Sequence, residues 1–334
     1  AETASDYQGK AHNERLTQVA AKGFLGKVYL TMAGFPLNDA AKKAEAQQLF
    51  KEVIDYATAK NKYWMADMDA WNQSWLHEND NKYAIFEIQY IAEAGQGNPM
   101  VTLTVPSNPG TDWCGNNLVT GTHVYIERGL QRHFIAKDEI TGEYLDKRVD
   151  GTLNLKETVD EDGNIITSKG NTFYTKYFES KVKRAKFGKS DMDATIVDRT
   201  YWPQNFQLLR IEDIMLLYAE CVGNTTEGRE LVNRIRRRAG LADLDINLSE
   251  EEFQKAVQDE RRYELAEEGV RWFDLVRRNE YVDTIKQMFI DDDDTENGTY
   301  KQYANRVNAD MYLYPIPQSQ IEVRKGLYTQ NKGY

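Results

Sequence analysis

Residues 260–278 read ERRYELAEEGVRWFDLVRR, and this stretch decides how the fold of the whole chain is interpreted. On a helix, Glu260, Glu264 and Glu268 recur every four residues and lie on one face, with arginines around them. Paired carboxylates act in glycoside hydrolases, where the general acid needs a raised pKa. Carboxylates close to arginines instead have lowered pKa values. The alternative is therefore a structural helix that ion pairs hold in place.

Other residues of the stretch favour the structural alternative. Glu267 precedes Arg271 by four residues, the order of acid and base that stabilises a helix, and Asp274 precedes Arg278 in the same way. Two adjoining stripes are apolar, so the helix packs on several sides. The stripes consist of Tyr263, Ala266, Val270 and Phe273, and of Leu265 and Trp272. A glycosidase needs two carboxylates about 5 to 10 Å apart across a cleft. We therefore predict a scaffold helix, in which Gly269 marks a bend or a close approach.

Helical hairpins are predicted on both sides of an irregular middle region. In residues 13–60, Leu25-Gly26-x-x-Tyr29 and Ala46-x-x-x-Phe50 fit the two helices of a tetratricopeptide-like hairpin, interrupted by GFPLND. FQLLRIEDIMLLYAECVG and RELVNRIRRRAG form a second helical hairpin around a TTEG turn. A third helix begins after Ser249, where Glu252 completes a capping box, and continues into residues 260–278.

The middle region, residues 61–200, has the pattern of strands and loops. YAIFEIQY (83–90) and MVTLTV (100–105) resemble strands, and Asp162-Gly163 between β-prone flanks predicts a β-hairpin. Residues 95–121 are rich in Gly, Asn, Thr and Pro, which predicts a long loop. Loops of this length in a compact domain are usually functional or disordered.

Composition and charge exclude several classes of partner. The 334 residues carry a formal charge of −11, which repels nucleic acid and anionic lipid. No apolar run reaches the roughly 18 to 20 residues of a membrane-spanning helix. The first ten residues lack a signal-peptide core, so we expect the chain as given to be soluble, with a removed leader or lipid anchor left open. Cys114 and Cys221 leave a single disulfide open.

Motifs for catalysis, metals and cofactors are missing from the sequence. HExxH, CxxC, GxSxG, GxxxxGK[ST] and GxGxxG do not occur, so we predict no cofactor and no catalytic metal. The acidic tract DDDDTENG (291–298) could attract calcium. However, an EF-hand frame with Gly298 in sixth place puts Ala304 where the bidentate glutamate belongs, which favours a solvated acidic loop.

Tryptophans provide the strongest indication of a ligand site. Trp64, Trp71 and Trp75 follow helical spacing, which favours a buried face, although Trp75 is kept as a candidate. Trp113 lies in PSNPGTDWCGNNLVTGTHVY (106–125), where an aromatic face and amide side chains have the composition of a sugar-binding loop. Trp113 either stacks on a sugar or pins the loop to the body, and Trp202 has the same two alternatives. The candidate ligand-binding residues are Trp113, Asp112, Asn116, Asn117, His123, Tyr125, Trp75 and Trp202.

Taken in order, the motifs resemble one known family. AAKGFLGKVYL, LDKRVDG, LLRIEDIMLLYAEC, LVNRIRRRAG, ERRYELAEEGVRWFDLVRR, YPIPQSQIE and the terminal QNKGY resemble the SusD/RagB family of nutrient-uptake outer-membrane lipoproteins. The resemblance covers nearly the whole chain and is most specific in its last 130 residues or so. Members are usually longer, and this chain resembles their C-terminal two-thirds. Tyr83 stands where the family's strand often begins with glutamate.

This resemblance implies a mainly α fold, an α/α superhelix of tetratricopeptide-like hairpins with irregular, strand-containing insertions that carry the ligand site. It implies one domain over residues 1–334, with a hairpin at 13–60, binding insertions at 61–200 and helical hairpins at 201–334. It also implies a non-catalytic protein, lipid-anchored on the outer face of the outer membrane, that passes oligosaccharides to a SusC-like TonB-dependent transporter. A peptide-binding protein, a pure scaffold and, less in keeping with the residues, a glycoside hydrolase are the alternatives.

Overall fold

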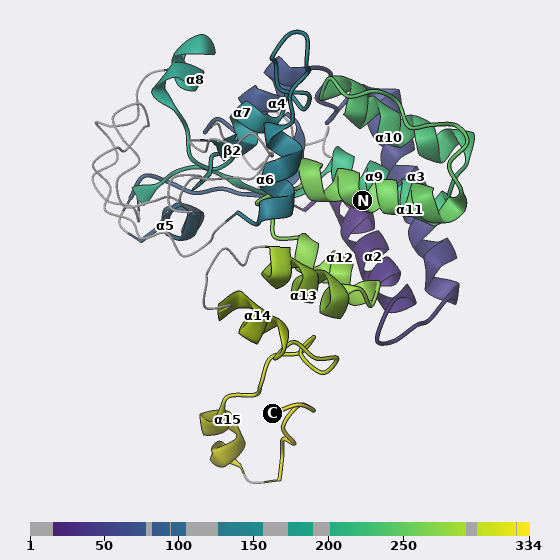
Figure 1. Ribbon diagram of the computed structural model, residues 1–334, viewed down its shortest axis with the longest axis vertical. Helices are drawn as coiled ribbons and strands as arrows, with labels where there is room; N and C mark the ends of the chain where they lie inside the picture. Colours follow the sequence, from purple (N-terminus) through teal and green to yellow (C-terminus); the bar gives the residue numbers. More distant parts are fainter. Residues whose placement is uncertain are drawn as a thin grey trace.

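Helix α9 (Ile211–Val222) lies among other helices of the chain (Figure 1). The computed structural model describes residues 16–77, 82–93, 95–104, 126–155, 173–189, 201–291, 299–324 and 326–334. All residues of α9 except Val222 are buried, including the acidic Glu212, Asp213 and Glu220. A helix that is buried all round needs neighbours on every side. Helices α3 (Ala41–Lys60), α10 (Thr226–Arg238) and α11 (Glu250–Glu264) provide them.

The first hairpin confirms the tetratricopeptide-like pattern. Helix α2 (Gln18–Ala33) begins at Thr17, whose hydroxyl accepts a hydrogen bond from the Ala20 amide at 3.2 Å, and packs along α3. A Cβ atom on Gly26 would lie 2.5 Å from the Phe50 ring, so the two helices approach closely only because Gly26 has no side chain. Both positions belong to the sequence pattern that predicted the hairpin.

Helix α11 begins as predicted but ends early. Ser249 and Glu252 form the capping box, in which the Ser249 amide donates to Glu252 Oε2 at 2.7 Å. The helix ends at Glu264, and Glu267 and Gly269 follow with positive φ angles of 69° and 73°. Helix α12 (Arg271–Arg277) then starts in a new direction, so one continuous helix over residues 260–278 was a wrong prediction. Gly269 marks the predicted bend, while the alternative of a close approach fails because, apart from its chain neighbours, no atom of the described residues lies within 4 Å of where its Cβ would be.

This turn also changes the expected side-chain pairs. Asp274 binds Arg277 and Arg261 instead of Arg278. Glu267 accepts a hydrogen bond from the Lys176 amide at 3.1 Å instead of pairing with Arg271. Phe273, placed on the apolar stripe by helical spacing, is 65% exposed. These differences share one cause, because residues that follow a reversal no longer continue the face of the helix before it.

Two predictions of secondary structure are wrong, one of a helix and one of a strand. FQLLR, predicted to open a helix, is strand β4 (Phe206–Arg210), paired antiparallel with β1 (Ala84–Ile88), which is a predicted strand. MVTLTV, predicted as a strand, contains the short helix α5 (Met100–Thr104). The Asn98 side chain accepts from the first amide of α5, that of Met100, at 2.9 Å, as capping residues do. Propensity is weak in segments this short, and tertiary partners decide their structure.

Short elements fill the rest of the described chain, which is mainly helical with two two-stranded sheets. They are α4 (Met68–Ser74), α6 (Arg128–Ile135), α7 (Val149–Thr152), β2 (Leu153–Asn154), β3 (Phe173–Tyr174), α8 (Lys181–Lys186), α13 (Tyr281–Asp291), α14 (Thr299–Ala304) and α15 (Gln318–Val323). Strands β2 and β3 form the second sheet, and α15 lies away from the helical body near the C-terminal end (Figure 1).

Some expectations concern residues outside the described ranges. These are the hairpin at Asp162-Gly163 and residues 292–298 of the acidic tract. Cys221 is a free, buried thiol, so the structure does not contain the disulfide that the sequence left open. Within the described ranges, no helix combines the length and apolar character needed to cross a membrane.

Candidate functional site

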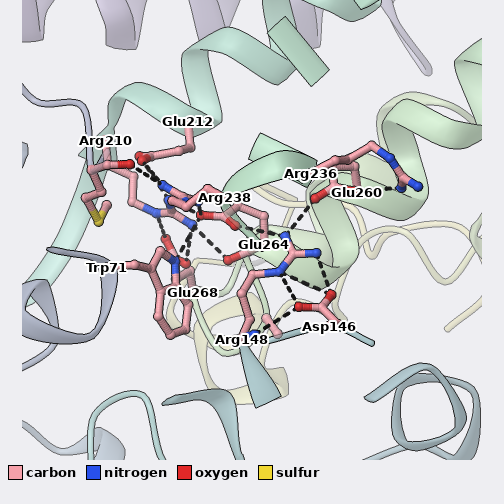
Figure 2. Close-up of polar contacts among 12 residues, drawn as sticks. Trp71, Asp146, Arg148, Arg210, Glu212, Arg236, Arg238, Glu260, Glu264 and Glu268 are labelled. Carbon is pink, nitrogen blue, oxygen red and sulfur yellow. Dashed lines mark hydrogen bonds and ion pairs between the residues drawn. The ribbon is translucent and has the colours of Figure 1, made fainter. Parts of the chain in front are cut away.

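Glu264 lies at the centre of a buried network of charges (Figure 2). Its carboxylate accepts hydrogen bonds from Arg148 at 2.9 Å, Arg210 at 2.7 Å and Arg238 at 2.5 Å, and from the indole of Trp71 at 3.2 Å. Burial alone would raise the pKa of Glu264, but attraction by the three arginines holds it well below its usual value. The side chain is therefore an ionised acceptor that cannot donate a proton near neutral pH.

The other two glutamates of the opening stretch are also paired. Glu260 Oε1 accepts from Arg148 at 2.7 Å, and Glu268 accepts from Arg210 at 2.8 Å and from the Lys176 ammonium at 2.8 Å. All three carboxylates are less than a tenth exposed. They consequently lack the open, substrate-facing pair that glycoside hydrolysis requires.

The cations of the network come from segments that are far apart in the sequence. Arg148 lies in the LDKRVDG motif before α7 and is held by Asp146 at 2.6 Å, whereas Arg210 ends β4 and Arg238 ends α10. Figure 2 shows these side chains converging on Glu264 from different elements. Each motif therefore supplies one part of a single structural core, and the three segments are joined through the end of α11.

A second buried network joins α9, α11 and α12. Arg277 binds Glu220 through both terminal nitrogens, at 2.5 and 2.7 Å, and also binds Asp274 at 2.8 Å. Arg261 bridges Asp274 and Asp213, at 2.8 Å each. Attraction by Arg277 lowers the pKa of Glu220 to about 2 although burial opposes the shift. Each acid and each arginine is thus satisfied by partners on another helix.

The predicted binding loop is attached to the body beside residues 262–267. Thr104, the last residue before 105–125, is buried, and its hydroxyl donates to the Met100 carbonyl at 2.9 Å and lies near enough to the Glu267 carboxyl to favour its ionised form. On the other side of 105–125, Ile126 packs in a small core that includes Ala266. Glu127 caps α6 and forms an ion pair with Arg262. The opening stretch therefore supports both ends of the segment to which the sequence assigns ligand binding.

Glu267 is expected to make stability depend on pH. Burial raises the pKa of its carboxyl to about 8, against the attraction of Lys176, while the value for an unfolded chain is 4.5. The folded state therefore retains a proton that the unfolded state loses as pH rises above 4.5, and the free energy of unfolding falls up to about pH 8. The largest slope for this one proton is about 1.4 kcal/mol per pH unit.

Glu267→Gln should remove this pH dependence, because glutamine is uncharged and can still accept from the Lys176 amide. Urea unfolding of both proteins at pH 5, 6, 7 and 8 measures the effect. Glu139→Gln, at an exposed position, is the control and should keep the wild-type slope. If the free energy of unfolding changed with pH in the same way for wild type and Glu267→Gln, the Glu267 carboxyl would be ionised in the folded state.

The structure tests only part of the predicted ligand site. Six candidates lie outside the described residues, namely Trp113, Asp112, Asn116, Asn117, His123 and Tyr125. Trp75 and Trp202 are described, and both have an exposed fraction of 0%. Trp75 lies under the Lys176 ammonium at 4.8 Å, and the Trp202 indole donates to the Tyr177 carbonyl at 2.8 Å. These two are core residues with no ring face open to a sugar, which corrects their assignment as ligand-binding residues.

The chain is similar to known proteins in both sequence and structure. A family model described as the SusD family matches residues 34–334. SusD-like protein P38 of Formosa agariphila is 34% identical over 118 residues, which are 32% of this chain and 22% of that protein. SusD-like protein P25 of the same organism is 26% identical over 161 residues, 45% of this chain and 28% of that one.

Solved structures share the fold over almost the whole chain. A SusD homolog from Bacteroides thetaiotaomicron has a TM-score of 0.74 at 21% identity, covering 99% of this chain and 66% of that one. Surface glycan-binding protein A from Bacteroides uniformis has a TM-score of 0.63 at 23% identity, covering 97% of this chain and 63% of that one. A protein described as a laminarin binding SusD-like protein has a TM-score of 0.63 at 21% identity, covering 96% of this chain and 63% of that one. The chain thus spans less than two thirds of the length of each of these relatives, and because the family model matches 34–334, it belongs to the SusD family.

Proposed function

We propose that this protein binds oligosaccharides at the cell surface and delivers them to a SusC-like TonB-dependent transporter. The observation that carries the proposal is the family match over residues 34–334, together with structural relatives that are named for glycan and laminarin binding. A place on the outer face of the outer membrane, with an N-terminal lipid anchor in the full-length protein, belongs to the same proposal. The net charge of −11 does not hinder a neutral glycan, since such a ligand has no charge to repel.

A non-catalytic role is supported by the state of the conspicuous carboxylates. Glu260, Glu264 and Glu268 are buried and bound by arginine or lysine, and the pKa of Glu264 is lowered by its arginines. A hydrolase acid needs the opposite shift and access to substrate. We therefore assign these residues to the scaffold and ligand recognition to the segment around Trp113.

Trp113→Ala is expected to weaken oligosaccharide binding by about 1 kcal/mol or more, because a stacking aromatic face and its buried area are lost. Retardation of the protein in native gels that contain individual glycans identifies a ligand, and calorimetry then measures its affinity. Tyr314→Ala is the control, since Tyr314 is an 82% exposed aromatic residue in another part of the chain. Unchanged affinity in Trp113→Ala would move the ligand site away from this residue.

A scaffold whose ligand is only the transporter is the second candidate. It is favoured by the outer face of α2, where Leu25 and Val28 are 41% and 52% exposed although the helix packs its opposite face on α3. A scaffold of this kind would give a blank screen with both glycans and peptides and would still co-purify with a membrane barrel protein. Retardation by any glycan decides in favour of the first candidate.

A further inference from the structure

A cavity of about 240 Å³ lies where α11, the following turn and α12 meet the start of α6 and strand β3. It is smaller than the roughly 300 to 1,000 Å³ pockets that hold drug-sized ligands, and this size suits one monosaccharide unit. The acids of the two buried networks bind arginines of those networks and leave the cavity open. We therefore consider the cavity separately from the networks that stabilise the scaffold.

Three arginines and three acids line the cavity, but burial raises the pKa of one of the acids, Glu267, to about 8, so positive charge is in excess at neutral pH. Arg261 and Asp274 line the cavity, but they bind each other at 2.8 Å. Arg262 pairs with Glu127. Arg271 makes no hydrogen bond or ion pair within the part of the chain that the structure describes, although Asp274, Asp259 and Glu280 attract it through space. One guanidinium group with five donor hydrogens thus remains available at the cavity wall.

The position of Arg271 makes an anionic partner favourable. Burial lowers the pKa of Arg271, and burial together with repulsion from Arg271 lowers the pKa of Arg262. An anion in the cavity would offset the loss of hydration of the buried Arg271 guanidinium. It would also reduce the repulsion between Arg271 and Arg262. A carboxylate matches the planar fork of arginine best, since it can accept two parallel hydrogen bonds.

Aromatic and apolar side chains form the remaining wall. Trp272 lies next to Arg271 in the sequence, and Tyr174 and Leu130 face the cavity from β3 and α6. The Trp272 ring meets Tyr281 edge to face at a centroid distance of 5.9 Å, an arrangement that holds the indole in place. Apolar walls with a few convergent polar groups are typical of small-molecule sites. Rigid aromatic surface beside a cation suits a ring with apolar C–H faces and one negative substituent.

We propose that this cavity binds a sugar unit that carries a carboxylate, of the uronic acid type, with Arg271 as the partner of the carboxylate. The assignment of a sugar rests on the proposed function, whereas the preference for an anion rests on the cavity itself. This site is separate from the segment around Trp113 and gives the protein a preference for acidic over neutral glycans.

The test uses D-glucuronate and D-glucose as matched probes, with acetate as a carboxylate that lacks a ring. Calorimetry or ligand-observed NMR on the full chain should show glucuronate binding about tenfold or more tighter than either of the others, as expected for a hydrogen-bonded ion pair. Arg271→Gln should abolish the preference, and Arg271→Lys should retain part of it, because charge remains while the two-pronged geometry is lost. Arg132→Gln removes an exposed arginine on α6 and should leave binding unchanged.

Different failures have different meanings in this experiment. Equal binding of glucuronate and glucose, or a preference that persists in a folded Arg271→Gln variant, overturns the acidic site. Equal binding of acetate and glucuronate overturns the assignment of a sugar ring. If neutral oligosaccharides bind and the binding depends on Trp113 while glucuronate shows no advantage, the proposed function stands and this inference alone falls. Absence of binding for every glycan overturns both.

Discussion

Glu264→Gln is expected to lower the free energy of unfolding by about 3 to 5 kcal/mol, the usual cost of breaking a buried ion pair. Glutamine keeps the shape of the side chain but removes the negative charge that Arg148, Arg210 and Arg238 share. Its amide hydrogens would also face arginine donors. Each of the three guanidinium groups keeps another acid partner, but the site loses one of its negative charges, and the positive charge left without a counter-charge is costly away from water.

Urea unfolding followed by circular dichroism measures this effect. Glu230→Gln is a suitable control, because Glu230 also pairs with an arginine, Arg237, at 2.9 Å, but its side chain is 51% exposed. An exposed ion pair contributes about 0 to 1 kcal/mol, so the control should remain close to wild type. If Glu264→Gln were as stable as the control, the network would not be what holds these segments together.

Arg277→Met is expected to have a similarly large effect, about 3 to 5 kcal/mol, through the second network. Methionine fills part of the space but leaves Glu220 without its two-pronged partner and removes one donor from Asp274. The only other ion pair that the structure shows for Glu220 within its described ranges is with Arg278, at 3.2 Å. Helices α9 and α12 would then be joined through charge only by this weaker pair and by Arg261, which bridges Asp213 and Asp274.

Acid unfolding gives this prediction a second readout. The pKa of Glu220 is about 2 in the folded protein and 4.5 in an unfolded chain. Its lowered pKa therefore stabilises the fold above pH 4.5, and this contribution is lost as pH falls from 4.5 towards 2. Arg277→Met should raise the folded-state pKa and make this loss smaller.

Arg237→Met is the matched control for Arg277→Met. Arg237 also binds two acids, Glu230 and Asp243, but its side chain is 48% exposed. We expect a change of at most about 1 kcal/mol, because water screens these pairs. Equal destabilisation by the two substitutions would mean that burial does not determine the strength of these contacts.

Local sequence signals predicted the parts of the fold that depend on near neighbours. The capping box at Ser249, the close packing of Gly26 on Phe50 and the strand at 84–88 were predicted and are present. The end of α11, strand β4 and helix α5 were not, because each depends on a partner distant in the sequence; for α5 this is the segment at 202–204, whose carbonyls hold the capping residue Asn98. Arg210, for example, ends a strand only because β4 pairs with β1, and β1 lies more than a hundred residues earlier.

The buried networks could be predicted only in outline. The prediction of a structural role for Glu260, Glu264 and Glu268 is confirmed, although Glu268 lies beyond the end of α11 and not on the predicted helix face. It could not indicate that Arg148 and Lys176 approach from other segments, since spacing along one helix carries no information about distant residues. The composition of residues 106–125 still predicts the ligand-binding segment, whereas helical spacing alone was the better guide to the buried position of Trp75.

Calorimetric titration of the protein with an oligosaccharide that retards it in native gels is the most direct test of the central claim, binding without catalysis. Binding alone should give heat that saturates at a fixed stoichiometry and returns to baseline after each injection, with the oligosaccharide recovered intact. Heat that continues after each injection while shorter products accumulate would contradict it.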